Sequence, residues 1–327
     1  MREKPKVLVT RLLPGPGMDA LRKYFDLDIN QEDKAISRED LKERIRNKDG
    51  LVCLLTDNID AAIVARAMYL KIIANYAVGY NNIDVVEASK RKIPVTNTPE
   101  VLTETTADLT FGLLISVARR IVEADSFLRS GRFTGWAPTL LLGTDIHGKV
   151  LGIIGMGRIG QALARRARGF RMKIVYNDAE RLSADREDEY GVQYRPLKDL
   201  LRESDYISIH APLNEQTEGL ISVEEFRIMK KTAYLINAAR GSIVDEKALV
   251  AAIKNKQIAG CALDVYENEP QFDDGLLSLQ NVVLVPHIGS ASIEARTEMA
   301  SMVAENVISV LIEKKQPPNI VNPEIYS

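Results

Sequence analysis

The chain has 327 residues, which is enough for two domains of ordinary size. Hydrophobic residues make up 46% of it and charged residues 27%, as is typical of a soluble globular protein. The 43 basic and 45 acidic side chains nearly cancel, so the charge balance indicates no nucleic-acid partner and no anionic membrane partner.

The cysteines and the apolar segments indicate a reducing compartment. Cys53 and Cys261 each lie inside an aliphatic stretch, which predicts buried thiols rather than a disulfide or a metal pair. The sequence offers no zinc ligand set, so no metal is expected. The apolar stretch near the start is too short for a signal peptide, and residues 109–118 are too short to cross a membrane. We therefore expect a cytoplasmic protein.

The first hundred residues alternate between short aliphatic segments and helical patterns. This alternation predicts a small α/β domain with a parallel sheet covered on both faces. Ser37 is a candidate N-cap for the second helix. The fourth strand runs into a polar loop at residues 79–84, where open parallel sheets bind ligands. The expected strands are residues 5–10, 27–30, 50–56, 71–78 and 93–99, and the expected helices are 18–24, 37–47 and 61–68.

Residues 104–131 are expected to form one long helix, with Thr103 as a cap and Gly131 at its end. Its apolar positions are too numerous for one face, so we expect it to pack on two bodies, either two domains or two subunits. Residues 132–148 show no clear period and predict a long loop. Such loops in compact proteins are usually functional or lie between subunits.

Residues 149–178 predict a strand, a glycine turn, a helix and a second strand. Gly155, Gly157 and Gly160 form a G-x-G-x-x-G pattern directly after the first strand. The first glycine permits a tight turn, the second lets a pyrophosphate approach the backbone, and the third lets the helix pack closely on the strand. The positive end of the helix then faces the glycine loop and favours a pyrophosphate. This context predicts dinucleotide binding.

Asp178 ends the second of these strands, about 20 residues past the glycines. A carboxylate there can accept hydrogen bonds from the adenosine ribose and repel a 2′-phosphate. The position therefore favours NAD over NADP. Asn177 and Arg181 lie close enough to alter this preference, and a surface Asp is often only a turn residue.

From residue 149 to about 286 the pattern predicts a doubly wound domain of six parallel strands. Four of them end in a polar residue, namely His210, Arg240, Asp264 and His287. The carboxyl ends of parallel strands share one edge of the sheet, so these side chains are expected on the edge that carries the glycine loop. A long amphipathic helix follows and is expected to return to the first domain. The expected strands are 149–155, 173–178, 206–212, 232–239, 258–265 and 281–287.

Five segments together resemble the D-isomer-specific 2-hydroxyacid dehydrogenases, and within them the glyoxylate/hydroxypyruvate reductases. The segments are NYAVGYNNID (75–84), GMGRIG (155–160), LINAARGSIVDEKAL (235–249), ALDVYENEP (262–270) and VPHIGSA (285–291). The resemblance implies a Rossmann cofactor domain, residues 100–287, inserted in a flavodoxin-like substrate domain, residues 1–99 and 288–327. It also implies two doubly wound parallel sheets, a cleft that closes between the domains, and a homodimer formed through the long helix and loop.

The resemblance also implies the catalytic residues Arg240, Glu269 and His287. A guanidinium can clamp the carboxylate of a 2-oxo acid with two parallel hydrogen bonds. An imidazolium can protonate the carbonyl oxygen as hydride arrives from the nicotinamide, and a carboxylate partner stabilises that imidazolium. His287 and Glu269 take these two roles. Glu267 is a rival to Glu269, but only Glu269 occupies the family's position before proline.

By the same matching, backbone N–H groups of Val78 and Gly79 bind the substrate carboxylate, and Asp264 binds the nicotinamide carboxamide. His210 is expected to form a wall beside the adenosine rather than to act in catalysis. Leu140 stands where several glyoxylate/hydroxypyruvate reductases have a tryptophan that reaches the partner's site, which puts a hydroxypyruvate preference in doubt. The expected cofactor-binding residues are Thr106, Gly155, Gly157, Arg158, Ile159, Gly160, Asp178, His210, Ala211, Pro212, Ala238, Ala239, Arg240, Asp264, His287 and Gly289.

Other functions remain open at this point. An L-lactate or malate dehydrogenase would carry its glycine loop near the N-terminus, and a formate dehydrogenase would carry glutamine in place of Glu269. Another D-2-hydroxyacid, phosphoglycerate or phosphite dehydrogenase remains possible. An NAD-sensing corepressor retains the same triad but is expected to carry disordered regulatory tails, whereas folded elements are predicted almost to both ends of this sequence.

Overall fold

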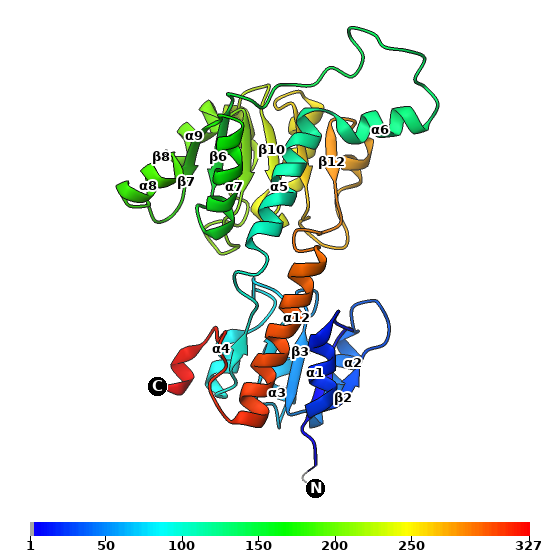
Figure 1. Ribbon diagram of the computed structural model, residues 1–327, viewed down its shortest axis with the longest axis vertical. Coiled ribbons are helices and arrows are strands. Elements are labelled where there is room, and N and C mark those ends of the chain that lie inside the picture. Colours follow the sequence, from blue (N-terminus) through cyan, green and yellow to red (C-terminus); the bar gives the residue numbers. More distant parts are fainter. Residues whose placement is uncertain (1–2) are drawn as a thin grey trace. The chain divides into compact units, whose positions relative to one another are not determined.

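A computed structural model describes residues 3–327. The chain forms two compact units, the first from Met1–Leu102 with Ala291–Ser327 and the second from Thr103–Ser290. Each unit contains one all-parallel sheet, of five and seven strands, which confirms two α/β domains. In Figure 1 the blue-to-cyan and red ends of the chain make up the first unit. The two units meet at residues 102/103, where helix α5 starts, and at 290/291.

The sheet of the first unit has the strand order β2-β1-β3-β4-β5, which is a flavodoxin-like order. Strands β1, β3 and β4 are almost wholly buried and largely aliphatic, as expected where helices cover both faces, whereas the edge strand β2 is partly exposed. The register pairs Val7 with both Leu27 and Gly50. The strands are β1 (Lys6–Val9), β2 (Asp26–Ile29), β3 (Gly50–Cys53), β4 (Ile73–Asn75) and β5 (Val95–Thr96).

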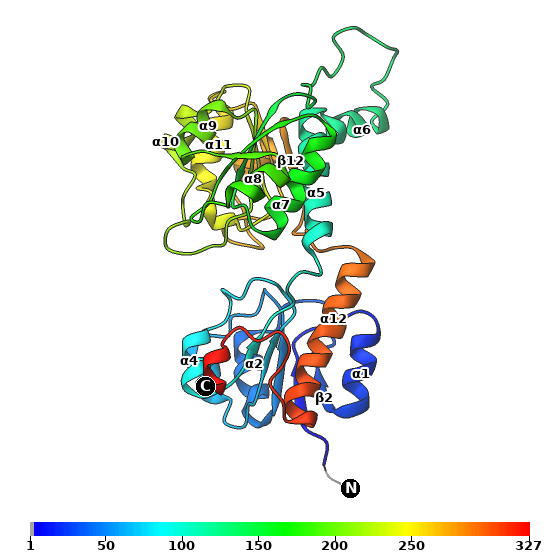
Figure 2. The ribbon, with the colours of Figure 1, turned by 60° about the vertical axis from the view of Figure 1, so that its left-hand side comes forward.

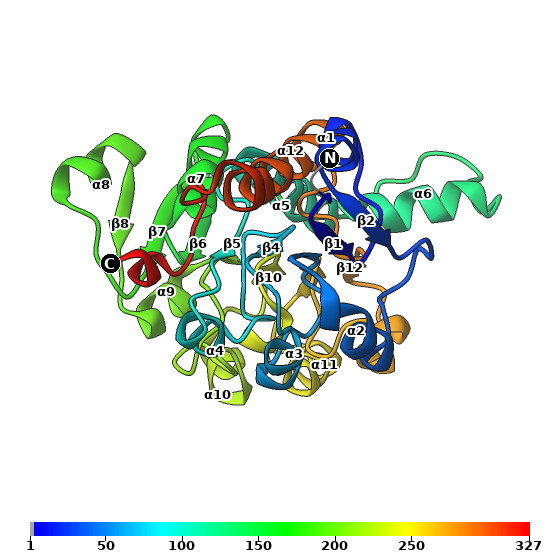
Figure 3. The same cartoon turned by 90° about the horizontal axis from the view of Figure 1, so that it is seen from below.

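Successive strand residues alternate between two apolar layers. Val7, Val9 and Val52 pack with α1 (Pro16–Tyr24) and α12 (Ile293–Ile308). The alternate residues, including Leu8 and Leu51, pack with α2 (Arg38–Arg44), α3 (Ala61–Arg66) and α4 (Val85–Lys90). Figure 3 shows the strands of this unit between these two sets of helices. Ser37 caps α2 as predicted, since its side chain accepts from Asp40 N.

The C-terminal segment completes the first unit, as predicted. Helix α12 lies along α1 in Figures 1 and 2. The two backbones approach so closely that a β-carbon built at Gly17 would lie 2.3 Å from Ala300 O. A π-helical turn (Ser309–Glu313) follows, and the tail then pairs with the edge strand β5, with Val321 N donating to Val95 O at 2.8 Å. The chain therefore covers that edge with its own tail.

The second unit has a seven-stranded sheet in the order β12-β11-β10-β9-β6-β7-β8. The sequence predicted six strands and missed β8, a three-residue edge strand between Gly191 and Arg195 that is too short to show a period. The order reverses at β6, so the switch point between β6 and β9 is where a doubly wound sheet binds its ligand. The strands are β6 (Val150–Ile154), β7 (Lys173–Asn177), β8 (Val192–Tyr194), β9 (Tyr206–Ile209), β10 (Tyr234–Asn237), β11 (Gly260–Leu263) and β12 (Val282–Leu284).

Helices cover both faces of this sheet as well. One apolar layer contains α5 (Thr103–Ala118) and α7 (Arg158–Gly169) against Leu151, Ile153 and Ile236. The other contains α9 (Leu197–Glu203), α10 (Val223–Ile228) and α11 (Glu246–Lys254). Helix α8 (Ala184–Tyr190) precedes β8. Apolar side chains therefore cover both faces of the sheet, and the polar residues that follow the strands lie at its edge.

The prediction of one long helix over residues 104–131 is wrong, because the segment forms α5 and then α6 (Ile121–Arg129). Arg120 has φ 54°, in the left-handed region, which stops the helical hydrogen-bond ladder. Its guanidinium binds Glu123 at 2.8 Å and Leu142 O at 3.2 Å. Thr103 is the first helical residue rather than the cap, whereas Gly131, at φ 72°, follows the end of α6 as predicted.

Helix α6 and the loop after it differ from the rest of the second unit. None of the α6 residues is buried, and residues 132–148 form an irregular loop as predicted. Figures 1 and 2 show both extending outward from the remainder of the unit. Elsewhere, Cys53 and Cys261 are buried free thiols, as expected. Among residues 3–327, no helix is long and apolar enough to span a bilayer.

Candidate active site

The glycine loop joins β6 to α7, and each glycine meets different surroundings. Gly155 has φ 94°, and a β-carbon there would lie 2.4 Å from Ala211 N. A β-carbon at Gly160 would lie 2.3 Å from Gly155 O, so the helix packs directly on the turn. At Gly157, the N-cap of α7, a β-carbon would meet nothing within 4 Å. The loop is tight on two sides and open at the helix N-terminus, which fits a pyrophosphate.

Asp178 follows β7 beside this loop. Its Oδ2 accepts from Met156 N at 2.6 Å, so the carboxylate is tied to the glycine turn. Arg181, which could attract a 2′-phosphate, instead forms two hydrogen bonds with Glu187 at 2.8 and 2.9 Å. That ion pair and the hydrogen bond from Tyr176 lower the pKa of Glu187 to about 2. Asp178 therefore places a carboxylate beside the glycine loop, while the nearby Arg181 is paired with Glu187.

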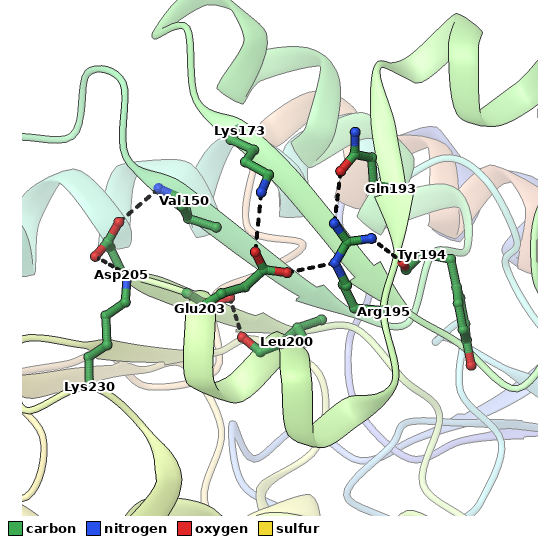
Figure 4. Close-up of polar contacts among 10 residues, drawn as sticks. Val150, Lys173, Gln193, Tyr194, Arg195, Leu200, Glu203, Asp205 and Lys230 are labelled. Carbon is green, nitrogen blue, oxygen red and sulfur yellow. Dashed lines mark hydrogen bonds and ion pairs between the residues drawn. The ribbon is translucent and has the colours of Figure 1, made fainter.

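A second charged cluster, shown in Figure 4, contacts β6, β7 and the segments that flank α9. Glu203, at the end of α9, binds Lys173 at 3.2 Å and Arg195 at 2.8 Å. Asp205 accepts from Val150 N at 2.9 Å and from Lys230 at 2.8 Å. Glu203 thus links α9 to β7 and to Arg195, and Asp205 links the start of β9 to β6 and to Lys230. The opposite charges are paired with one another, so we interpret the cluster as structural rather than catalytic.

His210 follows β9 and is held as a neutral ring. Burial lowers the pKa of His210 to about 4. Its Nε2 lies 2.8 Å from Ser208 Oγ, and its backbone N–H donates to Ile154 O at 2.7 Å. Among the described residues Nδ1 is buried without a protein partner. Such a group is unsuited to proton transfer near neutral pH and is consistent with the predicted wall.

Arg240 lies in a turn that β10 itself organises. Asn237, the last residue of β10, donates to Arg240 O at 2.9 Å and accepts from Ala239 N at 3.1 Å. The guanidinium donates to Ala239 O at 2.7 Å. Burial lowers the pKa of Arg240, and the charge of Glu269 partly opposes this shift. The guanidinium remains cationic, because an arginine pKa lies far above neutral pH.

Asp264 follows β11 and organises the turn after β12. It is 1% exposed, and its two carboxylate oxygens accept from Ile288 N at 2.6 Å and Gly289 N at 2.8 Å. Burial raises the pKa of this carboxyl. Thr106 on α5 donates to Gly289 O at 3.0 Å. These bonds fix the turn that carries His287, so Asp264 acts here as a scaffold.

His287 and Glu269 form a hydrogen-bonded pair, with 2.8 Å between Nδ1 and Oε2. His287 has φ 52°, an uncommon left-handed conformation that the turn imposes on it. Tyr266 N donates to the other Glu269 oxygen at 3.0 Å. Burial opposes ionisation of Glu269, but the hydrogen bond and charge of His287 outweigh it, so the pKa of Glu269 lies below its usual value. A partly exposed imidazole is thus paired with an ionised carboxylate.

Two supporting residues were missed by the sequence reasoning. A β-carbon at Gly241 would lie 1.9 Å from Tyr266 C and O, so the turn after Arg240 packs directly on the segment leading to Glu269. Glu246, in the first turn of α11, is 6% exposed and accepts from Glu267 N at 3.1 Å and from Asp273 N. In sequence, Glu246 looks only like an acidic residue at a helix N-terminus.

The second unit therefore brings most of the predicted residues to one sheet edge. The glycine loop, Asp178, His210, Arg240, Asp264 and His287 each follow the carboxyl end of a strand. In the first unit Val78 and Gly79 lie half-buried on the turn after β4. Leu140 lies in the loop after α6.

This chain is similar to known proteins over nearly its whole length. Residues 111–289 match the D-isomer specific 2-hydroxyacid dehydrogenase, NAD binding domain. The glyoxylate reductase of Korarchaeum cryptofilum (strain OPF8) is 52% identical, over 98% of this chain and 97% of its own. The crystal structure of the TT0316 protein from Thermus thermophilus superposes with a TM-score of 0.91 and 42% identity, over 97% of this chain and 99% of that one.

A third relative is the NADPH-dependent glyoxylate/hydroxypyruvate reductase of Sinorhizobium meliloti, in complex with NADP and malonate. Its TM-score is 0.86 at 32% identity, and it covers 98% of this chain and 97% of its own. The fold and these matches define a nicotinamide-dependent oxidoreductase. The chain belongs to the D-isomer-specific 2-hydroxyacid dehydrogenase family, which confirms the resemblance stated above.

Proposed function

We propose that this enzyme reduces glyoxylate, and hydroxypyruvate less well, to glycolate and D-glycerate with NADH as reductant. The observation that carries the proposal is the pair formed by His287 Nδ1 and Glu269 Oε2 at 2.8 Å, in the unit that contains Arg240. The names of the relatives, which include glyoxylate reductases of about half-identical sequence, support the choice of substrate.

His287 is the proposed proton donor. Because Nδ1 faces Glu269, Nε2 is the nitrogen left to protonate the carbonyl oxygen of the substrate. Glu269 stabilises the imidazolium, and its lowered pKa keeps it ionised where the enzyme works. A bound NADH supplies the hydride.

Arg240 is the proposed clamp for the substrate carboxylate. A guanidinium presents parallel donors that match both carboxylate oxygens, and burial of this one strengthens the attraction. Backbone N–H groups of Val78 and Gly79 are the proposed second contact. Leu140 in place of a tryptophan would make the proposed pocket more apolar, which disfavours the extra hydroxyl of hydroxypyruvate, so we favour glyoxylate.

NADH is the proposed cofactor, with NADPH the weaker one. The open space before Gly157 fits the pyrophosphate, and Asp178 fits a ribose with free hydroxyls. A 2′-phosphate would meet the Asp178 carboxylate, while Arg181 is held by Glu187. The Sinorhizobium meliloti relative is NADPH-dependent, so the ratio of kcat/KM values for the two cofactors must be measured directly.

The test is oxidation of NADH and NADPH with glyoxylate, hydroxypyruvate, pyruvate and 3-phosphohydroxypyruvate. We expect Arg240→Ala and His287→Ala to lose at least a hundredfold in kcat/KM for glyoxylate while still binding NADH. His147→Ala, which removes an exposed histidine of the loop before β6, is the matched control and should be unchanged. Full activity in the His287 variant would refute the proposed mechanism. NADH binding without turnover of any of these acids would favour a sensing role.

We also propose that the chain forms a homodimer through α6 and residues 132–148. Both segments expose large apolar side chains that the rest of their unit does not cover. A cytoplasmic location stays a prediction.

A further inference from the structure

The turn after β4 has an unusual pattern of hydrogen bonds. Three successive carbonyl groups, those of residues 77, 78 and 79, each accept a hydrogen bond from a different donor within the first unit. The donors are Thr98 N to Ala77 O at 2.9 Å, Asn97 Nδ2 to Val78 O at 2.8 Å, and Asn75 Nδ2 to Gly79 O at 2.9 Å. All three carbonyl oxygens are thereby held towards β4, β5 and the segment after β5.

Because the peptide group is planar, the positions of these carbonyl oxygens also fix where the neighbouring N–H groups point. In a trans peptide the N–H points opposite to the C=O of the same unit. Fixing the carbonyls of residues 77–79 therefore turns the N–H groups of Val78, Gly79 and Tyr80 away from these donors. Within residues 3–327, none of the backbone hydrogen bonds outside helices and strands uses any of these three N–H groups. The turn itself passes from half-buried at Val78 to 44% exposed at Tyr80.

The amide of Asn75 is rigidly held. Asn75 is fully buried, and its Oδ1 lies 3.6 Å from Cys53 Sγ and 3.5 Å from Asn82 Nδ2. Asn82 in turn donates to Leu54 O at 3.0 Å and Asp57 O at 3.1 Å. The donor that reaches Gly79 O is therefore anchored to the loop after β3 and cannot easily rotate away.

The backbone of Asn97 is fixed by the C-terminal tail, and this positions the side-chain amide of Asn97. Asn97 N donates to Asn319 O at 3.2 Å, so the C-terminal tail fixes the residue. The next residue, Thr98, is fully buried and supplies the N–H that binds Ala77 O. Two side-chain amides and one backbone N–H, all from fixed positions, thus define the three peptide planes.

We propose that Asn75 and Asn97 are positioning residues, which orient the N–H groups of Val78, Gly79 and Tyr80 to receive the carboxylate of the substrate. The inference rests on the proposed function and deepens it, since it adds Tyr80 N–H as a donor and names the residues that preset the site. Successive N–H groups directed the same way form an anion-binding concavity. If one of these three peptide planes flips, its C=O would point at the substrate carboxylate in place of its N–H. The attraction between the peptide and the carboxylate would then become repulsion. The amides are therefore required as donors, a role that no carboxylate side chain can fill.

The first experiment compares Asn97→Ala with Asn30→Ala. Asn30 also donates to a backbone carbonyl, Lys34 O at 3.2 Å, but follows β2, three strands from β4 in the sheet. We expect Asn97→Ala to raise the KM for glyoxylate and the inhibition constant of oxalate about tenfold each, with kcat changed less than threefold. NADH affinity should be unchanged, and Asn30→Ala should leave all four values unchanged. An unchanged KM in Asn97→Ala would overturn the proposal.

The isosteric variant Asn97→Asp separates orientation from a packing effect. Ionised, its side chain cannot donate and repels the substrate carboxylate, whereas protonated it can again donate to Val78 O. We expect the ratio of its KM to the parent KM to fall as the pH is lowered from about 6 to about 4, towards the ordinary aspartate pKa of about 3.9. A ratio independent of pH would contradict the proposal. If the parent reduces no 2-oxo acid, the proposed function fails instead, and oxalate binding to the parent and to Asn97→Ala, followed by calorimetry, still tests the site.

Discussion

At the scale of single residues, the glycine loop separates stability from cofactor binding. We predict that Gly157→Ala lowers the melting temperature only slightly, because its β-carbon meets nothing within 4 Å although alanine is a poorer N-cap than glycine. The same variant should weaken NADH binding at least tenfold by filling the space for the pyrophosphate. Gly160→Ala should instead destabilise the protein by about 1–3 kcal/mol, because its β-carbon would lie 2.3 Å from Gly155 O. Thermal melts and NADH titrations check both. If Gly157→Ala and Gly160→Ala had the same melting temperature and the same NADH affinity, the two glycines would not have the separate roles that we predict.

His210 gives a prediction for stability against pH. Its folded pKa, about 4, lies below the value of about 6.5 for an exposed histidine. The unfolded chain therefore binds more protons between these values, so the stabilisation is complete above pH ~6.5 and declines as the pH falls towards 4. We expect the free energy of unfolding to fall by about 2 kcal/mol between pH 7 and pH 5 through this group.

The measurement is urea unfolding of the parent and of His210→Gln at both pH values. Glutamine cannot titrate, so the variant should lose less stability than the parent over the same interval. The difference between the two proteins isolates the histidine from other groups that titrate in this range. Identical pH dependence in both proteins would show that His210 is not held neutral by the fold.

At the scale of elements, the strand ends position the site by contact with one another. Gly241 follows β10, and a β-carbon there would collide with Tyr266 C and O at 1.9 Å. We predict that Gly241→Ala shifts the segment that carries Glu269 and lowers kcat for glyoxylate about a hundredfold, because small displacements of catalytic groups are costly. Gly169→Ala is the control, since it ends α7 with nothing within 4 Å of its β-carbon. Steady-state kinetics and thermal melts would show whether activity falls while folding persists.

The same elements show what a sequence can predict. Both sheets and the glycine turn follow from aliphatic runs bounded by glycine and polar residues, because these patterns reflect local geometry. The break at Arg120 was missed because arginine favours helices and its left-handed conformation leaves no signal in the sequence. Strand β8 was missed because three residues show no period. Asn97 and the buried Glu246 bind segments distant from them along the chain, and sequence spacing does not contain such contacts. Asn75 binds Gly79 only four residues away, but the direction of its side chain is set by the fold.

At the scale of the whole molecule, the first unit depends on both ends of the chain. Helix α12 packs on α1, and the tail pairs with β5 through Val321 N and Asn322. Folding of this unit therefore requires contacts between residues separated by nearly the whole sequence, whereas the second unit is one continuous segment. The second unit's fold and cofactor loop are local to that segment, which explains why its function was the easier part to predict.

Self-association of the whole molecule is expected through the exposed apolar side chains of α6 and the loop after it. Trp136 is 84% exposed and Phe133 51%, both in the loop after α6, and Leu128 on α6 is 59% exposed. Aromatic side chains that are exposed together mark interfaces, and truncating such an anchor costs roughly 2 kcal/mol or more of binding energy. We predict that the parent is a dimer by light scattering and that Phe133→Ser with Trp136→Ser raises its dissociation constant at least thirtyfold. Leu277→Ser, which removes a 64% exposed side chain elsewhere in the second unit, should leave the dimer intact. A monomeric parent, or a double variant that dimerises as tightly as the parent, would exclude this surface as the interface.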